Sequence, residues 1–319
     1  MVLTDALKKV LNDELLTREE VDSLAECPLS DLSHAANEIR HHFLGNQFDL
    51  CTIVNAKCGH CSENCRFCAQ SAHWSIAGET WPLLSTDALL EAAKKDEAAG
   101  SPRFSLVTSG RRLSSKEVAA AAEALKVIRQ ETDLSLCGSF GLLGTKDFEV
   151  LADAGLQRVH CNLEASQNYF PHLCTTHSWQ EKVDTLKAAR QVGLDVCSGG
   201  LFGTGESLTD RLDLAFELRE LGVTSVPLNR LVPIQGTPLE SQSPVSYEEF
   251  LRTVALFRFV LPKAFLRLAG GRGSMPEAGK AAFEGGANAT ISGNMLTTSG
   301  YDLATDKKML DALGYEVVR

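Results

Sequence analysis

Residues 178–200, SWQEKVDTLKAARQVGLDVCSGG, contain the structural unit that decides the fold. Ser178 and Glu181 match a capping box, a pair of side chains that accept backbone N–H groups at a helix start. Apolar residues at helical spacing lead from there to Gly193, which can take the left-handed conformation that closes a helix. A short apolar run at 194–197 follows, and small polar residues come next. The stretch predicts a helix, a strand and a polar loop in succession.

The same unit recurs along the chain. Helical apolar spacing marks residues 83–99, 114–130, 178–192 and 207–221, and further capping boxes match Ser114 with Glu117 and Ser246 with Glu249. Strand candidates alternate with these helices at 50–54, 103–108, 134–137, 158–162, 194–197, 225–228, 265–268 and 289–291. Alternation of this kind favours parallel strands joined by helices. We therefore predict an α/β fold, a closed (β/α)8 TIM-type barrel with an N-terminal helical extension.

The chain is expected to form a single domain in three segments. Residues 1–48 predict N-terminal helices, two in number, residues 49–299 predict the barrel, and residues 300–319 predict a C-terminal helix and tail. No low-complexity linker separates the segments. Polar and sulfur-containing residues stand at the ends of the strand candidates, where barrel enzymes place their active sites.

Composition excludes several classes of protein. With 44% hydrophobic and 23% charged residues among 319, the chain resembles neither a disordered nor a fibrous protein. A net charge of -10 argues against a nucleic-acid partner, because phosphates require clustered Lys and Arg. No apolar run approaches the roughly 20 residues of a membrane span, so we expect no membrane partner and a cytoplasmic protein. In that reducing compartment, the ten cysteines are expected to bind metal or do redox chemistry.

Residues 57–68, KCGHCSENCRFC, carry the strongest chemical signal. Cys61, Cys65 and Cys68 have the spacing C-x3-C-x2-C, and such thiolates can hold three irons of a [4Fe–4S] cluster. The fourth iron would then be open to a chelating cofactor or substrate. A structural zinc site is the alternative, because Cys58 with Cys61 and Cys65 with Cys68 also form C-x2-C pairs. The spacer between the pairs is shorter than that of a zinc ribbon, which favours iron and sulfur.

The cysteine spacing, with Phe67 before the last cysteine, resembles the radical S-adenosylmethionine (SAM) superfamily. Further motifs are CAQS at 68–71, NLE at 162–164, CTT at 174–176, VCSGG at 196–200, GTGE at 203–206, SVPLN at 225–229, GTPL at 236–239, RLAGGR at 267–272 and MLTT at 295–298. In this order they are similar to the motifs of the biotin synthase family, from about residue 50 to residue 298. The cysteine spacing alone would identify only the superfamily.

The resemblance implies a sulfurtransferase reaction. Cys61, Cys65 and Cys68 match the ligands of a [4Fe–4S] cluster that binds SAM and reduces it to a 5′-deoxyadenosyl radical. In the family, this radical abstracts hydrogen from two carbons of dethiobiotin, and inserted sulfur completes the ring of biotin. The resemblance also implies a low-potential electron donor, a flavodoxin or ferredoxin, and a homodimer.

The resemblance assigns further site residues. Those that match cofactor-binding positions are Phe67, Asn162, Glu164, Gly200, Leu201 and Glu206. Those that match substrate-binding positions, or stand beside them, are His160, Asn162, Asn229, Thr297 and Thr298. Amide groups suit the ureido ring of dethiobiotin, and threonine hydroxyls suit its carboxylate. By itself, an asparagine at a strand end is more often a turn residue.

A second, auxiliary cluster is expected deeper in the barrel. In the family it is a [2Fe–2S] cluster, the sulfur donor, and Cys137, Cys197 and Arg267 match three of its four ligands. The remaining position, on the second strand, is Ser105, whose hydroxyl is a poor ligand beside thiolates. Cys51 can replace it, because inward residues of alternate strands share one layer of a barrel. Three thiolates favour a four-iron auxiliary cluster over [2Fe–2S], with an extra sulfide or Arg267 at the fourth iron.

Other interpretations remain open. Cysteine is among the most buried residue types, so each auxiliary cysteine could simply fill the core. A radical SAM relative of the hydrogenase-maturase or mutase type is the nearest alternative, and a zinc-stabilised binding protein is the alternative from another class. We expect three cysteines to be packing thiols: Cys27, Cys161 and Cys174. We expect three histidines to line a polar site or lie on the surface: His60, His73 and His177.

Overall fold

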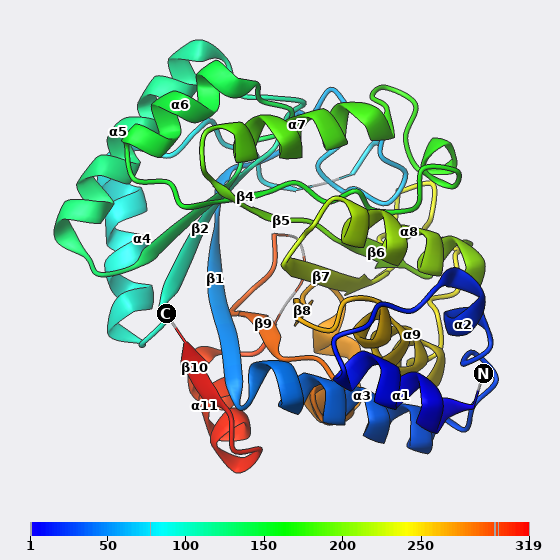
Figure 1. The fold of residues 1–319 in the computed structure, drawn as a ribbon. Helices are drawn as coiled ribbons and strands as arrows, with labels where there is room; N and C mark the ends of the chain where they lie inside the picture. The colour runs from blue at the N-terminus through cyan, green and yellow to red at the C-terminus, as the bar shows by residue number, and fades with distance from the viewer. Residues whose placement is uncertain (1, 77, 297, 299, 319) are drawn as a thin grey trace.

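A barrel of parallel strands forms the centre of the computed structural model, and helices surround it (Figure 1). The structure describes residues 2–76, 78–296, 298 and 300–318. The strands, in order around the barrel, are β1 (Gln47–Lys57), β2 (Arg103–Thr108), β3 (Ser135–Ser139), β4 (Arg158–His160), β5 (Asp195–Cys197), β7 (Ser225–Arg230), β8 (Phe265–Leu268) and β9 (Ala289–Ser292). β9 pairs with β1, with Cys51 opposite Ile291, and this pairing closes the barrel. The predicted (β/α)8 fold is confirmed.

The fifth strand of the barrel is split in two. β5 is followed, after Ser198 and Gly199, by β6 (Gly200–Phe202), and both pieces pair with β7. A Cβ atom at Gly199 would lie 1.9 Å from the carbonyl oxygen of Pro227, so only glycine allows this approach of the two strands. The strand predicted at 194–197 therefore corresponds to β5 and misses the continuation beyond the glycines.

Helices follow the strands and cover the outside of the barrel (Figure 1). They are α4 (Thr86–Ala98), α5 (Ser115–Glu131), α6 (Thr145–Asp153), α7 (Trp179–Gln191), α8 (Leu208–Glu220), α9 (Tyr247–Val260) and α10 (Lys280–Glu284), with the 3-10 turns η1 (Phe170–His172), η2 (Arg272–Ser274) and η3 (Pro276–Gly279). The predicted capping boxes at Ser114 and Ser178 are both present. They satisfy N–H groups that a first helical turn leaves unpaired.

The two ends of the chain differ in detail from the prediction. Residues 1–48 hold three helices instead of two: α1 (Leu3–Leu11), α2 (Arg18–Asp22) and α3 (Leu29–Leu44). The additional helix, α2, is too short to show an apolar repeat in the sequence. At the other end, α11 (Leu303–Ala312) is the predicted C-terminal helix. The predicted tail is wrong in part, since β10 (Glu316–Val318) pairs in parallel with the start of β1.

The barrel strands separate an apolar outer face from an inner face that mixes charged, polar and apolar side chains. On β2, Phe104 and Leu106 are fully buried in the main hydrophobic core, between strands and helices. Arg103, Ser105 and Val107 instead line a cavity inside the barrel. Successive side chains of a strand point to opposite sides, so this alternation follows from the pleat. The core therefore lies outside the strands, and the interior is left for chemistry.

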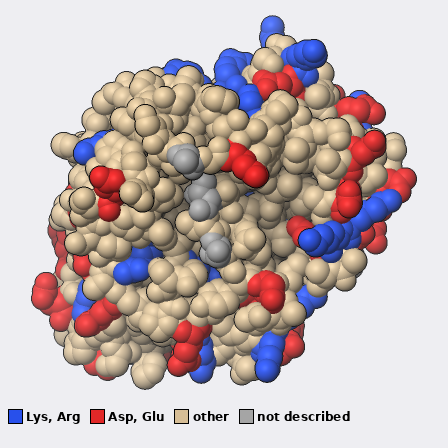
Figure 2. Space-filling model, turned by 180° about the vertical axis from the view of Figure 1, so that it is seen from behind, with Lys and Arg blue, Asp and Glu red and all other residues tan. Residues whose placement is uncertain are grey.

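Charged side chains on the surface are mixed. Figure 2 shows the face opposite to the view of Figure 1, where acidic and basic side chains are interspersed and mostly surround a largely uncharged centre. Among the described residues, no helix combines the length and apolar character needed to cross a membrane.

Candidate active site inside the barrel

One cavity of about 420 Å³ brings together both groups of predicted cluster ligands. Its lining includes Cys51, Cys61, Cys65, Cys68, Cys137 and Cys197. Other predicted site residues in its lining are Phe67, His160, Asn162, Glu164, Leu201, Asn229, Arg267 and Thr298. Gly200 and Glu206 are not part of the lining, and Thr297 lies outside the described residues. The structure thus places most of the predicted site residues around one cavity.

The loop after β1 presents three thiols to this cavity. Its shape comes from backbone hydrogen bonds: Cys61 N donates to Gln70 O, and Cys68 N donates to Cys65 O, both at 3.0 Å. Gly59 has a φ of 78°, and a Cβ atom there would lie 2.4 Å from a threonine methyl group. The position therefore needs glycine. The chain itself thus holds Cys61, Cys65 and Cys68 around one part of the cavity.

Without a bound metal, two of these thiols keep their protons. Burial raises the pKa of Cys68 to about 11. A hydrogen bond with Cys174 and burial raise the pKa of Cys65. A thiol must lose its proton to bind a metal, and a bound cation provides the charge that stabilises the thiolate. These residues therefore suit a cationic metal better than free thiolate chemistry.

Three further thiols line the cavity deeper in the barrel. Cys51 on β1, Cys137 on β3 and Cys197 on β5 are all buried. A hydrogen bond with Cys137 and burial raise the pKa of Cys51. The same hydrogen bond lowers the pKa of Cys137 to about 6, against the effect of burial. The sulfurs of Cys51 and Cys137 therefore adjoin, as expected for residues on alternate strands.

An excess of positive charge surrounds these deep thiols. Asp49 Oδ2 lies 2.7 Å from Arg158 Nη1 and 2.9 Å from Arg267 Nη2, and its Oδ1 lies 3.5 Å from Arg103 Nε. Burial raises the pKa of Asp49, but the charges of Arg267, Arg158 and Arg103 outweigh burial and lower it. One carboxylate faces three guanidinium groups, so positive charge remains uncompensated within the barrel. Arg103 Nη1 also donates to the sulfur of Cys137 at 3.6 Å.

Three of these charged residues were not predicted from the sequence. Asp49 stands two positions before Cys51, and Arg103 stands two positions before Ser105, so each pair shares the inner face of its strand. Arg158 opens β4, where it pairs in register with Cys137. The sequence did offer a signal for these residues, because each is a charged residue on the inner face of a buried strand. Asp49 is the carboxylate that pairs with Arg267.

A polar group forms another wall of the cavity. Gly199 N donates to Asn162 Oδ1 at 3.0 Å, and Asn162 Nδ2 lies 3.5 Å from Glu164 Oε2. Glu164 has a φ of 71°, a strained conformation for a residue with a side chain. Burial raises the pKa of Glu164 and lowers the pKa of His160 to about 4. This wall offers amide, carboxylate and neutral imidazole groups to a polar ligand.

Asn229 joins two segments of the barrel. Its Nδ2 donates to the carbonyl oxygen of Gly200 at 2.9 Å, and its Oδ1 accepts from Gly270 N at 2.8 Å. The amide is therefore held in one orientation against the cavity. Gly200 itself contributes through packing, because a Cβ atom there would lie 2.4 Å from the side chain of Leu214.

Glu206 shapes a loop. Its carboxylate accepts from Gly203 N at 2.8 Å, from Thr204 N at 2.7 Å and from Arg211 Nε at 2.7 Å. Because these partners occupy both oxygens, Glu206 is engaged within residues 203–211. The contact with a cofactor that the resemblance implied for Glu206 has no support in this arrangement.

The residues present fit two iron–sulfur clusters. Thiolate-ligated clusters are anionic overall, and the uncompensated arginine charge around Cys137 would balance a deep one. A buried excess of positive charge without an anionic partner is strongly unfavourable. The loop thiols and the polar wall lie on the same cavity, so a cofactor bound at the loop would face the wall.

Two family matches cover most of the chain. Residues 57–218 match the radical SAM superfamily, and residues 227–316 match the Biotin and Thiamin Synthesis associated domain. The first match contains the loop thiols and the deep cysteines of β3 and β5. The second begins on β7 and includes Asn229 and Arg267.

Relatives that match nearly the full length of the chain identify the family more closely. The biotin synthase of Brachyspira hyodysenteriae is 48% identical over 315 residues, which cover 99% of this chain and 95% of the relative. The biotin synthase of Clostridium botulinum (strain Hall) is 48% identical over 310 residues, which cover 97% and 98% of the two chains.

Solved structures share the fold at lower identity. Methylornithine synthase superposes with a TM-score of 0.84 at 20% identity, covering 98% of this chain and 97% of that one. A maturase of the [FeFe]-hydrogenase has a TM-score of 0.85 at 15% identity, covering 99% and 75%. These similarities concern the fold alone. On the matches along its whole length, the chain belongs to the biotin synthase family of radical SAM enzymes.

Proposed function

We propose that the protein converts dethiobiotin to biotin by inserting sulfur between two carbons. The observation that carries this proposal is the single cavity lined by both groups of three thiols. When bound, a [4Fe–4S] cluster with SAM would supply a radical that abstracts hydrogen, and an auxiliary cluster would supply sulfur. The proposed ligands of the first cluster are Cys61, Cys65 and Cys68. Those of the auxiliary cluster are Cys51, Cys137 and Cys197.

The auxiliary cluster is proposed to contain four irons and an extra sulfide. Each iron of a [2Fe–2S] cluster needs two ligands beyond the bridging sulfides, and the deep site offers only three thiols. Arg267 is already engaged, since its Nη2 pairs with Asp49 and its Nη1 donates to Thr290 O at 2.7 Å. This engagement favours an exogenous sulfide over Arg267 at the fourth iron. Arg267 would then act by holding positive charge beside the cluster.

The polar wall is proposed to hold the cofactor and the substrate. Glu164 and Asn162 can bind the ammonium and hydroxyl groups of SAM, with Phe67 and Leu201 as apolar contacts. Beyond its bonds to Gly200 and Gly270, Asn229 keeps one N–H donor and one oxygen lone pair, which match the ureido ring of dethiobiotin. His160, Asn162, Thr297 and Thr298 complete the proposed substrate contacts.

The proposed partners are those that the resemblance to the biotin synthase family implies. A flavodoxin or ferredoxin is proposed as the low-potential electron donor, with a homodimer as the working assembly in the cytoplasm. One domain made of residues 1–48, 49–299 and 300–319 remains our proposal for the organisation of the chain.

Anaerobic reconstitution tests this function. We expect about eight irons per chain in the wild type and about four in Cys51→Ser, with Cys58→Ser as the thiol control that keeps about eight. With SAM, dethiobiotin and a low-potential reductant, the loaded wild type should form biotin. A loaded enzyme that cleaves SAM without forming biotin would instead favour a maturase or mutase type of reaction. A colourless protein with zinc and no sulfide would overturn the redox chemistry.

A further inference from the structure

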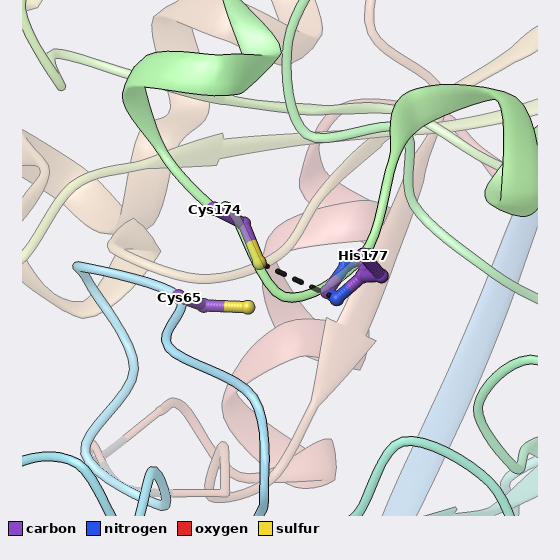
Figure 3. A group of neighbouring side chains, drawn as sticks. All are labelled: Cys65, Cys174 and His177. Atoms are coloured by element: carbon purple, nitrogen blue, oxygen red, sulfur yellow. Dashed lines mark hydrogen bonds between the residues drawn. The ribbon is translucent and has the colours of Figure 1, made fainter.

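Cys65, Cys174 and His177 form a second group of side chains that could hold a metal ion, which we call the Cys–Cys–His group. The two sulfurs and the Nδ1 atom of His177 all lie within 4.8 Å of one another. The sulfur of Cys174 is 3.3 Å from Nδ1. Figure 3 shows the three side chains pointing toward one another from two separate loops. The packing role that the sequence predicted for Cys174 is therefore incomplete.

These distances suit one tetrahedral ion. With Zn–S bonds of about 2.3 Å and Zn–N bonds of about 2.05 Å, a zinc tetrahedron has S···N edges of about 3.6 Å and S···S edges of about 3.8 Å. The 3.3 Å between Cys174 and His177 is close to the first value, and 4.8 Å bounds the other separations. Small side-chain rotations would bring all three atoms onto one ion.

The surroundings hold this group in place. Glu63 Oε2 lies 2.6 Å from His177 Nδ1 and accepts from Thr176 Oγ1 at 2.8 Å. Asn64 Oδ1 accepts from Thr175 N at 2.9 Å and contacts the sulfur of Cys174 at 3.4 Å. The bonds of Asn64 and Thr176 orient the loop that carries Cys174 and His177. An ion bound to Nδ1 would replace the contact between Nδ1 and Glu63, which leaves this carboxylate beside the ion as a fourth ligand.

The group is distinct from the lining of the barrel cavity. Cys65 contributes to that lining, whereas Cys174 and His177 do not. Cys174 is 4% exposed, and the side chain of His177 is 6% exposed. Cys65 therefore lies between two possible sites, one in the cavity with Cys61 and Cys68, and one behind it.

We propose that the protein without its [4Fe–4S] cluster binds one Zn²⁺ ion through Cys65, Cys174 and His177, with Glu63 at the fourth position. Two sulfurs and one imidazole at tetrahedral spacing select zinc over oxygen-preferring cations such as Mg²⁺ or Ca²⁺. The ion displaces the two thiol protons, which pass to solvent, and accepts the Nδ1 lone pair while the ring keeps its proton on Nε2. No oxidation or reduction is involved.

This site has a consequence that rests on the proposed function. Cys65 is also a proposed ligand of the SAM-binding cluster, and one thiolate cannot serve both positions. Zinc at the Cys–Cys–His group therefore excludes assembly of that cluster. The zinc form is a metal-loaded state that cannot react with SAM until the ion leaves.

Zinc titration of the cluster-free full chain tests the site itself. Zn²⁺ alone, added anaerobically against a chromophoric chelator, should bind at one ion per chain. Cys174→Ser and His177→Ala should each weaken binding by at least about tenfold, while Cys58→Ser and Cys68→Ser should leave the affinity unchanged. Circular dichroism should show all four variants folded. Unchanged affinity in Cys174→Ser, or loss in Cys58→Ser with Cys68→Ser, would overturn the site in favour of the C-x2-C pairs.

Cobalt and a competition experiment complete the test. Co²⁺ at the site should give charge-transfer absorption from two thiolates in the wild type and from one in Cys174→Ser; absorption from three or four would overturn the assignment. Zinc added before reconstitution should lower the iron content of the wild type but not of Cys174→Ser. Zinc binding without this competition would leave the site standing and contradict Cys65 as a cluster ligand.

Discussion

Arg267 and Asp49 form an ion pair inside the barrel, with 2.9 Å between Nη2 of the arginine and Oδ2 of the aspartate. The same carboxylate receives Arg158 at 2.7 Å. Asp49 thus links β1 to β4 and β8 across the interior, two residues before Cys51 on β1. The pair explains how a chain can bury several guanidinium groups around one sulfur-rich site, since a carboxylate among them offsets part of their repulsion.

Replacing Asp49 should therefore destabilise the barrel. In Asp49→Asn the buried arginines lose their shared anion, and we expect the free energy of unfolding to fall by about 3–5 kcal/mol. Urea unfolding of the cluster-free protein at pH 7.5 measures the change. Asp195→Asn, an exposed carboxylate on β5, is the matched control and should have little effect. Equal stabilities of the two variants would contradict a structural role for the pair.

The auxiliary site should change type when one thiol is moved. Ser105 pairs in register with Cys137 on the next strand, so a cysteine at 105 would lie beside the remaining thiols. We expect Cys51→Ser to lose the auxiliary irons. We expect Cys51→Ser with Ser105→Cys to recover about two of them as a [2Fe–2S] cluster, in which Arg267 exchanges its hydrogen bond to Thr290 O for the fourth ligand position. Mössbauer spectra and sulfide analysis distinguish the two clusters. Recovery of a four-iron spectrum in the double variant would argue against Cys51 as the residue that sets the cluster type.

The sequence could predict the barrel because its signals are local. The box at Ser178, the apolar repeat of α7 and Gly193 belong to one contiguous stretch, and each has a direct physical effect on the backbone. Closure of the barrel, with Cys51 opposite Ile291, joins distant segments. It followed from the number of repeated units, whereas the short β10 gave no pattern long enough to detect.

The candidate site was predictable only in part. Motifs of the family identified five of the thiols that line the cavity, and the layering of alternate strands added Cys51. Neither indicated Asp49, whose partners lie on other strands. The contact of Cys65 with Cys174 is equally non-local, because it depends on how two loops meet. Glu206 shows a further limit, since its motif gave no sign that the carboxylate accepts hydrogen bonds from its own loop.

A methyl group at the split strand should disrupt the barrel. In Gly199→Ala the new Cβ atom would lie 1.9 Å from the backbone oxygen of Pro227, which cannot move without breaking the contact of β6 with β7. We expect a loss of about 3 kcal/mol or more in unfolding free energy. Thermal unfolding measures it, with Gly144→Ala as control, because a Cβ atom there meets nothing within 4 Å. A similar unfolding temperature for both variants would show that the strand adapts.

The imidazole of His160 should make stability depend on pH. Burial lowers its pKa in the folded protein to about 4, whereas the ordinary value is 6.5. Between these values the unfolded chain binds a proton that the folded chain does not, so stability falls as the pH decreases from about 6.5 toward 4. His160→Gln removes this proton uptake, and the variant should lose less stability than the wild type between pH 7 and pH 5. Urea unfolding across this range measures the difference, and His34→Gln, an exposed histidine on α3, should follow the wild type. Parallel curves for the wild type and His160→Gln would mean that the imidazole is solvated and titrates alike in both states.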